Sequence, residues 1–125
     1  MRFIEIILYE FKNLALSIYK TIMEQDNYAA KIVLLGSNSV GKSQIVNRII
    51  NHEFAEEIEP TIGASFSSKR LEIDGKKIQL EIWDTAGSDR YKSLLPMYYR
   101  GAAIAIGVYD ITNKESWIEL TTLLE

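Results

Sequence analysis

The chain has 125 residues, a length that fits one domain, and its formal net charge is −3 at pH 7. Apolar residues make up 47% and charged residues 25%, which is ordinary for a folded domain, and this balance gives no sign of a nucleic-acid partner. There are no cysteines, and His52 is the single histidine. The composition therefore excludes disulfides, cysteine-ligated zinc, thiol catalysis and, within these residues, a prenyl anchor.

The first 27 residues carry an amphipathic pattern with a helical period. Apolar side chains recur three or four positions apart from Ile4 to Ile22, and polar side chains lie opposite them. Charged residues interrupt the run, so it does not form the stretch of about 20 apolar residues that a membrane span needs. We expect residues 1–27 to be an N-terminal helical extension packed on the domain. The alternatives are a disordered segment and a helix on a membrane surface, for which the balanced charges give little attraction.

Strands and helices alternate from Tyr28 onward. The patterns predict a strand over 31–35, a helix over 42–51, a loop over 52–63, paired strands over 65–73 and 77–83, a loop and short helix over 88–97, a buried strand over 102–109 and a helix over 115–124. Asp74-Gly75 is a strong turn signal between the paired strands. This order is typical of an α/β domain, which we place at residues 28–125.

The loop after the first of these strands has the pattern of a phosphate-binding loop. GSNSVGKS satisfies G-x-x-x-x-G-K-[ST] and lies between a predicted strand and a predicted helix. Its glycines let the backbone approach phosphates, and its N–H groups together with the helix N-terminus form an anion site. Lys42 is expected to reach the β- and γ-phosphates and Ser43 to bind Mg²⁺. The predicted ligand-binding residues of the loop are Gly36, Ser37, Asn38, Ser39, Val40, Gly41, Lys42 and Ser43. A glycine-rich turn with a solvated lysine is the alternative.

Two later stretches are able to complete such a site. Thr61 lies nineteen residues after Lys42 in PTIGASF, and Asp84 ends a predicted strand in WDTAG. An aspartate at a strand end can reach Mg²⁺ through water, and Gly87 can offer its N–H group to a γ-phosphate. Both loops would then order with a nucleoside triphosphate and relax without it.

With GSNSVGKS, PTIGASF, IWDTAGSDRYKSLLPMYYRGA and VYDIT in this order, the chain resembles the Ras-superfamily small GTPases, and most of all the Rab family. The resemblance implies a P-loop NTPase-type three-layer α/β sandwich that binds GTP and GDP. It implies Mg²⁺ held by Ser43, Thr61 and Asp84, and a γ-phosphate contact from Gly87. It further implies a role in vesicle traffic, in the cytoplasm or peripherally on endomembranes, with any membrane contact of this chain made through the N-terminal helix.

The resemblance also implies a surface for protein effectors and regulators, formed by residues 60–66 and 83–99. Its expected members are Ile62, Gly63, Phe66, Trp83, Tyr91 and Tyr98. For the aromatic residues, and above all for Trp83, plain core packing is the alternative.

Ser88 departs from the family pattern, because it stands where the family usually has the glutamine that orients the attacking water. A serine side chain is too short to replace that glutamine from the same position. We therefore take Ser88 and Thr61 as the catalytic positions and expect slow GTP hydrolysis, although a neutral substitution in a mobile loop is an alternative.

The end of the sequence departs further from the family. The guanine-reading N-K-x-D motif and the later S-A-K loop are missing, and Asn113-Lys114-Glu115-Ser116 opens a predicted helix instead of ending a strand. Without the aspartate of the N-K-x-D motif, two charge-assisted hydrogen bonds to the guanine would be absent. Their loss would lower the affinity for guanine nucleotides by roughly two to four decades. We therefore expect a fold that is incomplete at its C-terminus, with residues 102–109 as an apolar edge strand. The family's last helix, which covers one sheet face, is also missing, and the extension 1–27 would partly substitute for it.

Three interpretations stay open from the sequence. The first is a Rab-like GTP-binding switch. The second is a fragment or pseudo-GTPase that lacks useful nucleotide binding and acts as an interaction module. The third, a P-loop kinase or ATPase, is disfavoured because such enzymes need a lid with arginines and only four arginines follow Lys42.

Overall fold

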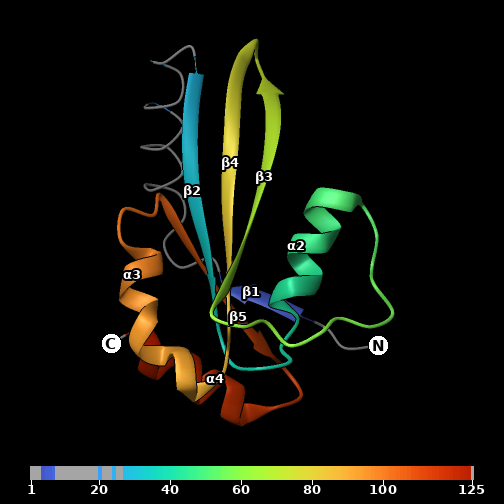
Figure 1. Ribbon diagram of the computed structural model, residues 1–125, viewed down its shortest axis with the longest axis vertical. Helices are drawn as coiled ribbons and strands as arrows, with labels where there is room; N and C mark the ends of the chain where they lie inside the picture. Colours follow the sequence, from blue (N-terminus) through green and yellow to red (C-terminus); the bar gives the residue numbers. More distant parts are fainter. Residues whose placement is uncertain (1–3, 8–19, 21–23, 25–26, 125) are drawn as a thin grey trace.

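In the computed structural model the described residues are 4–7, 20, 24 and 27–124, and they form a five-stranded sheet with helices on both faces (Figure 1). The strands are β1 (Ile4–Ile7), β2 (Asn27–Leu35), β3 (Ala64–Ile73), β4 (Lys76–Thr85) and β5 (Ile104–Asp110). The helices are α2 (Lys42–Asn51), the 3-10 helix η1 (Asp89–Leu94), α3 (Leu95–Tyr99) and α4 (Lys114–Leu124). The predicted α/β order of the elements from residue 31 onward is confirmed.

The strand order is β1-β5-β2-β4-β3, with β2 at the centre. β2 runs parallel to both β4 and β5, so the carboxyl ends of these three strands lie at one edge of the sheet. β3 and β4 form an antiparallel hairpin whose turn residues Asp74 and Gly75 have φ angles of 51° and 75°. Two successive positive φ angles are typical of the type I′ turn that Asp-Gly favours. Ligands of open α/β sheets bind beyond the carboxyl ends of the strands, and this edge positions the site described below.

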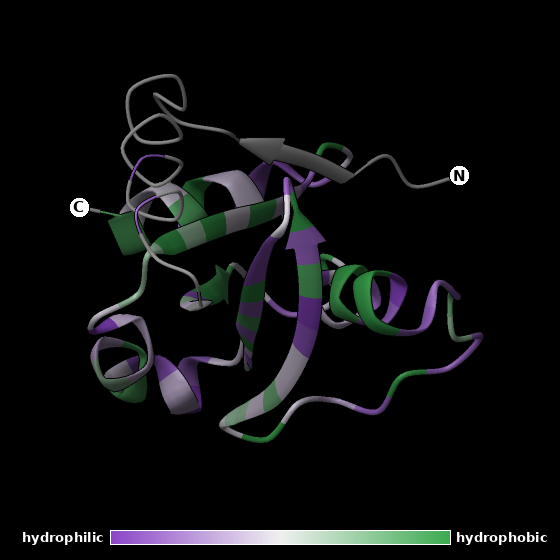
Figure 2. Ribbon diagram, turned by 90° about the horizontal axis from the view of Figure 1, so that it is seen from above, coloured by the Kyte–Doolittle hydropathy of each residue, from purple (hydrophilic) through white to green (hydrophobic). Residues whose placement is uncertain are grey.

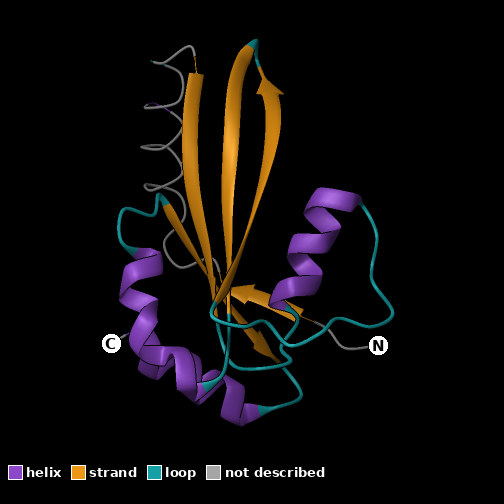
Figure 3. Cartoon of the chain, in the orientation of Figure 1, coloured by secondary structure: helices purple, strands orange, loops and turns teal. Residues whose placement is uncertain are grey.

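The core is divided between the two faces of the sheet, which makes the predicted three-layer arrangement (Figure 3). Alternate residues of β2 point to opposite faces, as the period of a strand requires. Leu34 packs toward α2 with Val46 and Ile82, while Leu35 packs on the other face with Leu95 and Leu120. Figure 2 shows bands of hydrophobic and hydrophilic colour along strands of the sheet. The phosphate-loop candidate thus leaves a strand that is fixed from both sides.

The N-terminal segment differs from its prediction. Ile4–Ile7 forms strand β1, antiparallel to β5, so the expected start of a helix at Ile4 is wrong. Three isoleucines in four residues favour a strand, and the free edge of β5 offers unpaired backbone groups to it. Because β1 covers that edge, the expectation that the strand over 102–109 is an edge strand is wrong as well.

The rest of the predicted helical stripe lies outside the described residues, apart from Lys20 and Glu24. The Glu24 N–H group donates to the Lys20 carbonyl at 3.1 Å, which is a helical spacing. The boundary between an extension at 1–27 and a domain at 28–125 stays a prediction. Among the described residues, no helix combines the length and the apolar character that crossing a membrane would take.

Candidate functional site

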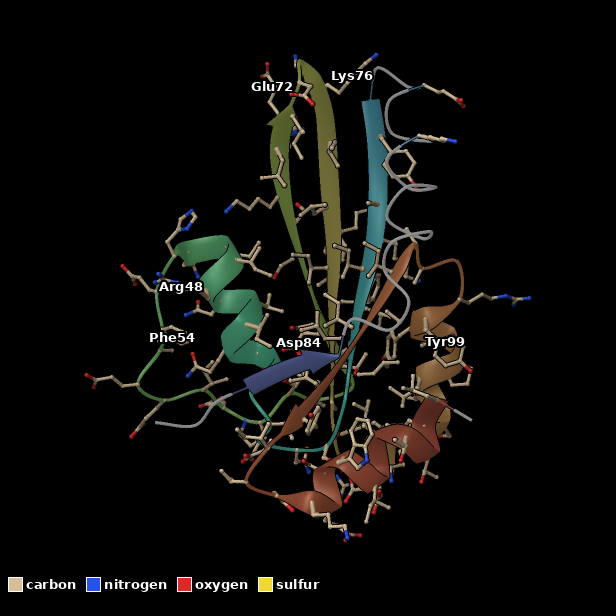
Figure 4. All side chains as sticks on the ribbon, turned by 180° about the vertical axis from the view of Figure 1, so that it is seen from behind. Arg48, Phe54, Glu72, Lys76, Asp84 and Tyr99 are labelled. Atoms are coloured by element: carbon tan, nitrogen blue, oxygen red, sulfur yellow. The ribbon has the colours of Figure 1, made fainter. Side chains whose placement is uncertain are left out.

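The candidate site lies at the carboxyl ends of β2 and β4. Asp84 pairs with Leu34 in the sheet register, so it lies two residues short of the level at which the chain turns into the loop at Gly36. Figure 4 shows Asp84 at the end of the sheet from which α2 begins. The sheet therefore holds the end of β4 beside the loop that carries the phosphate-binding pattern.

Only glycine fits the first position of this loop. Gly36 has a φ angle of 149°, and a Cβ atom added there would lie 2.1 Å from the carbonyl oxygen of Val108. The loop ends at Gly41, whose φ angle is 102°, and α2 starts at the next residue with no side-chain cap and no acidic residue in its first turn. The first N–H groups of a helix that has no cap are free to meet an anion.

Lys42 is buried at the start of α2 and turns back over the loop. Its side chain is 6% exposed, and its Nζ atom donates to the carbonyl oxygens of Gly36 at 2.9 Å and Ser37 at 2.6 Å. Burial lowers the pKa of Lys42 to about 8, although the charge of Asp84 acts in the opposite direction. A buried ammonium group gains most from an anionic partner, which suits a phosphate.

Three oxygen-bearing side chains meet next to Lys42. Ser43 Oγ donates to Asp84 Oδ2 at 2.5 Å and lies 3.1 Å from Thr61 Oγ1. Asp84 is 3% exposed, and burial raises the pKa of its carboxyl group, against the opposing effects of Ser43, Lys42 and Thr61. Within the described residues, its other oxygen, Oδ1, is buried without a hydrogen-bond partner.

These three residues fit Mg²⁺. The unpartnered carboxylate oxygen and the two hydroxyl groups are hard oxygen donors, which this cation prefers. The part of the chain that the structure describes holds no group of three His, Cys, Asp or Glu side chains able to bind a metal by themselves. Mg²⁺ in phosphate sites commonly needs only one or two protein ligands, because waters and substrate phosphates supply the rest.

Gly87 lies directly on the phosphate-loop candidate. A Cβ atom added at Gly87 would lie 2.3 Å from Asn38 N and 2.3 Å from the carbonyl carbon of Ser37. The segment after β4 is also joined to the loop that carries Thr61, because the Ala86 N–H group donates to the Gly63 carbonyl at 2.8 Å. The structure therefore brings the sequence-predicted site residues of all three stretches together.

Two cavities border this cluster and differ in charge. The larger, about 630 Å³, is lined by Asn38, Ser39, Gly41, Lys42, Ser43, Gln44, Ile58, Glu59, Pro60, Thr61, Ile62, Thr85, Gly87, Ser88, Arg90 and Tyr91. The smaller, about 210 Å³, is lined by Ser37, Asn38, Gly87, Asp89, Asn113, Glu115, Ser116 and Glu119. Its three carboxylates disfavour a phosphate, whereas the larger cavity contains Lys42 and the start of α2. Ser88 lines the larger cavity, beside Thr61.

The predicted partner surface is partly exposed and partly core. The rings of Phe66 and Trp83 lie 5.2 Å apart and those of Trp83 and Tyr98 lie 5.8 Å apart. Trp83 and Tyr98 pack against the core around Leu35. Phe66 is 52% exposed and Ile62 is 80% exposed, so these two present apolar surface to the solvent.

Other contacts were not expected from the sequence. Ser37 Oγ donates to Glu119 Oε2 at 2.7 Å, across 82 positions of the chain, and no local pattern signals such a pair. Gln44 binds the backbone of Ala55, as described below. Asn113 caps α4, because its Oδ1 atom accepts from the Glu115 N–H group at 3.1 Å. The interpretation of that stretch as a helix start is therefore confirmed.

Comparisons with known proteins agree with this geometry. Residues 31–125 match the model of the Ras family. The chain is 52% identical to the GTP-binding protein YPT53 of Saccharomyces cerevisiae over 95 residues, which are 76% of this chain and 43% of that protein. It is 56% identical to the Ras-related protein Rab5A of Oryza sativa over 88 residues, or 70% and 43% of the two chains.

The Ras-related protein RABF2a of Arabidopsis thaliana is 54% identical over 91 residues, which are 73% of this chain and 46% of that protein. The chain thus spans less than half the length of these curated relatives. The family model covers most of the chain, including every residue of the candidate site. The chain therefore belongs to the Ras family, and within it resembles the Rab proteins.

Proposed function

We propose that this chain binds GTP or GDP together with Mg²⁺ and acts as a Rab-like switch. The observation that carries the proposal is the meeting of Lys42, Ser43, Thr61 and an unpartnered Asp84 oxygen at one edge of the sheet. A buried ammonium group and a buried carboxylate are costly unless a ligand compensates them. A magnesium-bound phosphate group compensates both.

The residues have separate roles in this proposal. Lys42 and the first N–H groups of α2 bind the β- and γ-phosphates, so the Lys42 ammonium group exchanges carbonyl partners for stronger anionic ones. Ser43 and Thr61 present hydroxyl oxygens to the metal, and Asp84 reaches it directly or through water. When bound, Mg²⁺ neutralises the charge of the phosphate oxygens.

Thr61 and Gly87 make the site sensitive to the γ-phosphate. Each lies on a loop at the site: Thr61 Oγ1 lies 3.1 Å from Ser43 Oγ, and a Cβ atom added at Gly87 would collide with Asn38. Loss of the γ-phosphate removes a partner from both loops, and they relax. The exposed side chains of Ile62 and Phe66 lie next to these loops, so protein partners that bind residues 60–66 and 83–99 would distinguish the two states.

Hydrolysis is proposed to be slow. Ser88 lines the cavity beside Thr61, but its hydroxyl group is carried on a single carbon atom, so its reach toward an attacking water is short. The resemblance to the Rab family, which the Rab-named relatives support, implies a role in vesicle traffic with a peripheral location on endomembranes.

An interaction module without nucleotide is the second candidate. It is favoured by Asn113, in the stretch that resembles a guanine-reading motif, because its side chain is engaged as the cap of α4. In that case the surface around Ile62 and Phe66 would bind partners irrespective of nucleotide.

Titration of the chain with fluorescently labelled GTP, GDP and ATP in Mg²⁺ buffer tests the proposal, with Lys42→Ala as the matched variant. We expect saturable binding of both guanine nucleotides and a loss of at least tenfold in affinity in Lys42→Ala. A folded wild-type chain that binds none of them would refute the proposal and favour the interaction module. Equal binding of ATP would refute guanine specificity alone.

A further inference from the structure

The loop over residues 52–63 carries Thr61 to the site, and its first part lies along one side of α2. In Figure 3 this loop leaves the far end of α2 and returns past the helix toward the sheet. α2 spans ten residues and therefore about 15 Å, so the chain must run back most of this length to bring Thr61 to Ser43 at the start of the helix. The path of the returning segment thus decides where Thr61 can lie.

The polar side of α2 binds this returning segment by three consecutive contacts. Arg48 Nη1 donates to the His52 carbonyl, and Asn47 Nδ2 donates to the Glu53 carbonyl at 2.9 Å. Arg48 also lies over the ring of Phe54, 5.5 Å from its centre, and Figure 4 labels both residues on this side of the molecule. These contacts direct the segment toward the first turn of the helix.

Gln44 makes the last contact, and it makes two hydrogen bonds at once. Its Nε2 atom donates to the Ala55 carbonyl at 2.6 Å, and its Oε1 atom accepts from the Ala55 N–H group at 3.1 Å. Both backbone groups of Ala55 are thereby engaged by one side chain that is itself half-buried. Gln44 follows Ser43 directly, so the fixed point of the loop belongs to the same helical turn that holds Lys42 and Ser43.

Beyond Ala55, no comparable attachment of the loop to the described residues precedes the site. Residues 56–60 are all exposed. The next contacts are those of Thr61 with Ser43 and of Gly63 with Ala86. The free span is therefore five residues, and without Gln44 it would be six, because Phe54 is then the last residue in contact with α2. A shorter free span has fewer conformations, so less entropy is lost when Thr61, at its end, contacts Ser43.

From these contacts we propose that Gln44 is a positioning residue that anchors the Thr61 loop at Ala55 and slows the departure of Thr61 from the site. This inference rests on the proposed function, because it concerns the loop that closes on the bound nucleotide. Gln44 acts through Ala55 and the chain that follows, so it needs no contact of its own with the nucleotide.

Amide hydrogen exchange of the nucleotide-free chain tests the anchor without any ligand. Two amides report on it: Ala55, which donates to Gln44, and Ala86, which donates to Gly63 at the far end of the loop. In Gln44→Ala we expect the Ala55 amide to exchange about tenfold faster, a factor between those expected for losing one and two neutral hydrogen bonds. The Ala86 amide should also exchange faster, but by a smaller factor, because the free span lengthens by one residue. The matched control is Asn51→Ala, because among the described residues the Asn51 side chain binds Asn47 alone, so its loss leaves both hydrogen bonds between Gln44 and Ala55 in place.

A second variant separates anchoring from helix stability. In Gln44→Glu the carboxylate still accepts from the Ala55 N–H group but cannot donate to its carbonyl. An acidic residue in the first turn stabilises a helix through its dipole. We expect intermediate exchange at Ala55, whereas a purely helix-stabilising role predicts exchange at or below the wild-type rate.

The kinetic test is release of a labelled guanine nucleotide after dilution into excess unlabelled nucleotide. We expect nucleotide release to be faster in Gln44→Ala, by about the factor measured at Ala86, and unchanged in Asn51→Ala. An unchanged amide exchange rate at Ala55 in Gln44→Ala would overturn the claim that Gln44 anchors the loop there. Faster exchange at Ala55 with unchanged exchange at Ala86 would overturn its effect on Thr61. A wild-type chain that binds no nucleotide refutes the proposed function, and the exchange at Ala55 and Ala86 then decides the anchoring separately.

Discussion

Replacing Asp84 by asparagine should stabilise the nucleotide-free chain while destroying its response to Mg²⁺ and nucleotide. Asp84 is 3% exposed, and within the described residues its Oδ1 atom has no hydrogen-bond partner. Burial raises the pKa of this carboxyl group despite Ser43, Lys42 and Thr61, so the charged form costs folding free energy. Asparagine keeps the shape and removes the charge.

The magnitude follows from the charge on the unpartnered carboxylate, because the neutral amide of asparagine also leaves one polar atom without a partner. Leaving a buried polar group unsatisfied costs about 1–3 kcal/mol, and more for a charged group. We therefore expect Asp84→Asn to raise the free energy of unfolding by about 1–3 kcal/mol when nucleotide and Mg²⁺ are absent. In saturating Mg²⁺ and GTP the wild type should be more stable than Asp84→Asn, because it gains binding energy that the variant has lost.

The pH dependence has a definite sign. Because the pKa of Asp84 is raised on folding, the folded state binds more protons between the unfolded pKa and the folded one. Stability of the free chain therefore falls as the pH rises through that window, and Asp84→Asn should lack this part of the fall.

Urea unfolding followed by circular dichroism measures the stability gain of the free variant, its reversal with Mg²⁺ and GTP, and the pH dependence. Asp89→Asn is the matched control, because the Asp89 side chain is 85% exposed and the same isosteric change there removes a charge outside the site. If Asp84→Asn destabilises the free chain by more than Asp89→Asn does, Asp84 has a structural role and the reasoning is wrong.

Three further predictions concern neighbouring residues. The pKa of Lys42 is lowered to about 8 by burial, so the free chain should gain stability between about pH 8 and pH 10, by up to about 3 kcal/mol, and Lys42→Met should lack this gain in urea unfolding. Gly87→Ala should cost about 1–3 kcal/mol of stability, because its Cβ atom would meet backbone atoms of the loop at 2.3 Å. Ser88→Gln should raise single-turnover GTP hydrolysis about tenfold or more, because the longer amide side chain can orient the attacking water.

A specific result would contradict each of these three predictions. A stability gain of equal size in Lys42→Met would assign the pH effect to other groups. For Gly87→Ala the comparison is Gly101→Ala, where φ is 71° but a Cβ atom meets nothing within 4 Å, so a cost that is no larger than in this control would remove the steric argument. Unchanged hydrolysis in Ser88→Gln, with nucleotide binding intact, would show that Ser88 does not limit the rate.

The elements from residue 31 onward were predictable because their signals are local. The apolar run before Gly36 marks a buried strand, and Asp74-Gly75 specifies its turn by its own backbone preferences. Strand β1 was missed because a four-residue apolar stretch fits a helix or a strand, and the choice depends on β5, about a hundred residues away.

The candidate site also has a part that a local pattern predicts and a part that depends on the fold. The loop from Gly36 to Ser43 is contiguous, so its pattern alone indicates a phosphate site. The approach of Thr61 and Asp84 to Ser43 was inferred from a family resemblance. That of Asp84 follows physically from the parallel pairing of β2 with β4, and that of Thr61 from the loop that leads back from α2.

The contact of Gln44 with Ala55 was beyond prediction. Polar residues at helical spacing along α2 predict a solvated face, and no sequence pattern tells that the following loop turns back over it. The same holds for Ser37 and Glu119, which meet only because α4 packs beside the loop.

The central claim is that these residues form a working guanine-nucleotide site, and nucleotide content tests it most directly. The chain is purified in Mg²⁺ buffer and denatured, and released nucleotide is identified and quantified by chromatography. The account predicts close to one GDP or GTP per chain, with GTP in excess because hydrolysis is slow, and a lower nucleotide content in Lys42→Ala. A folded wild-type chain that releases no nucleotide would contradict it.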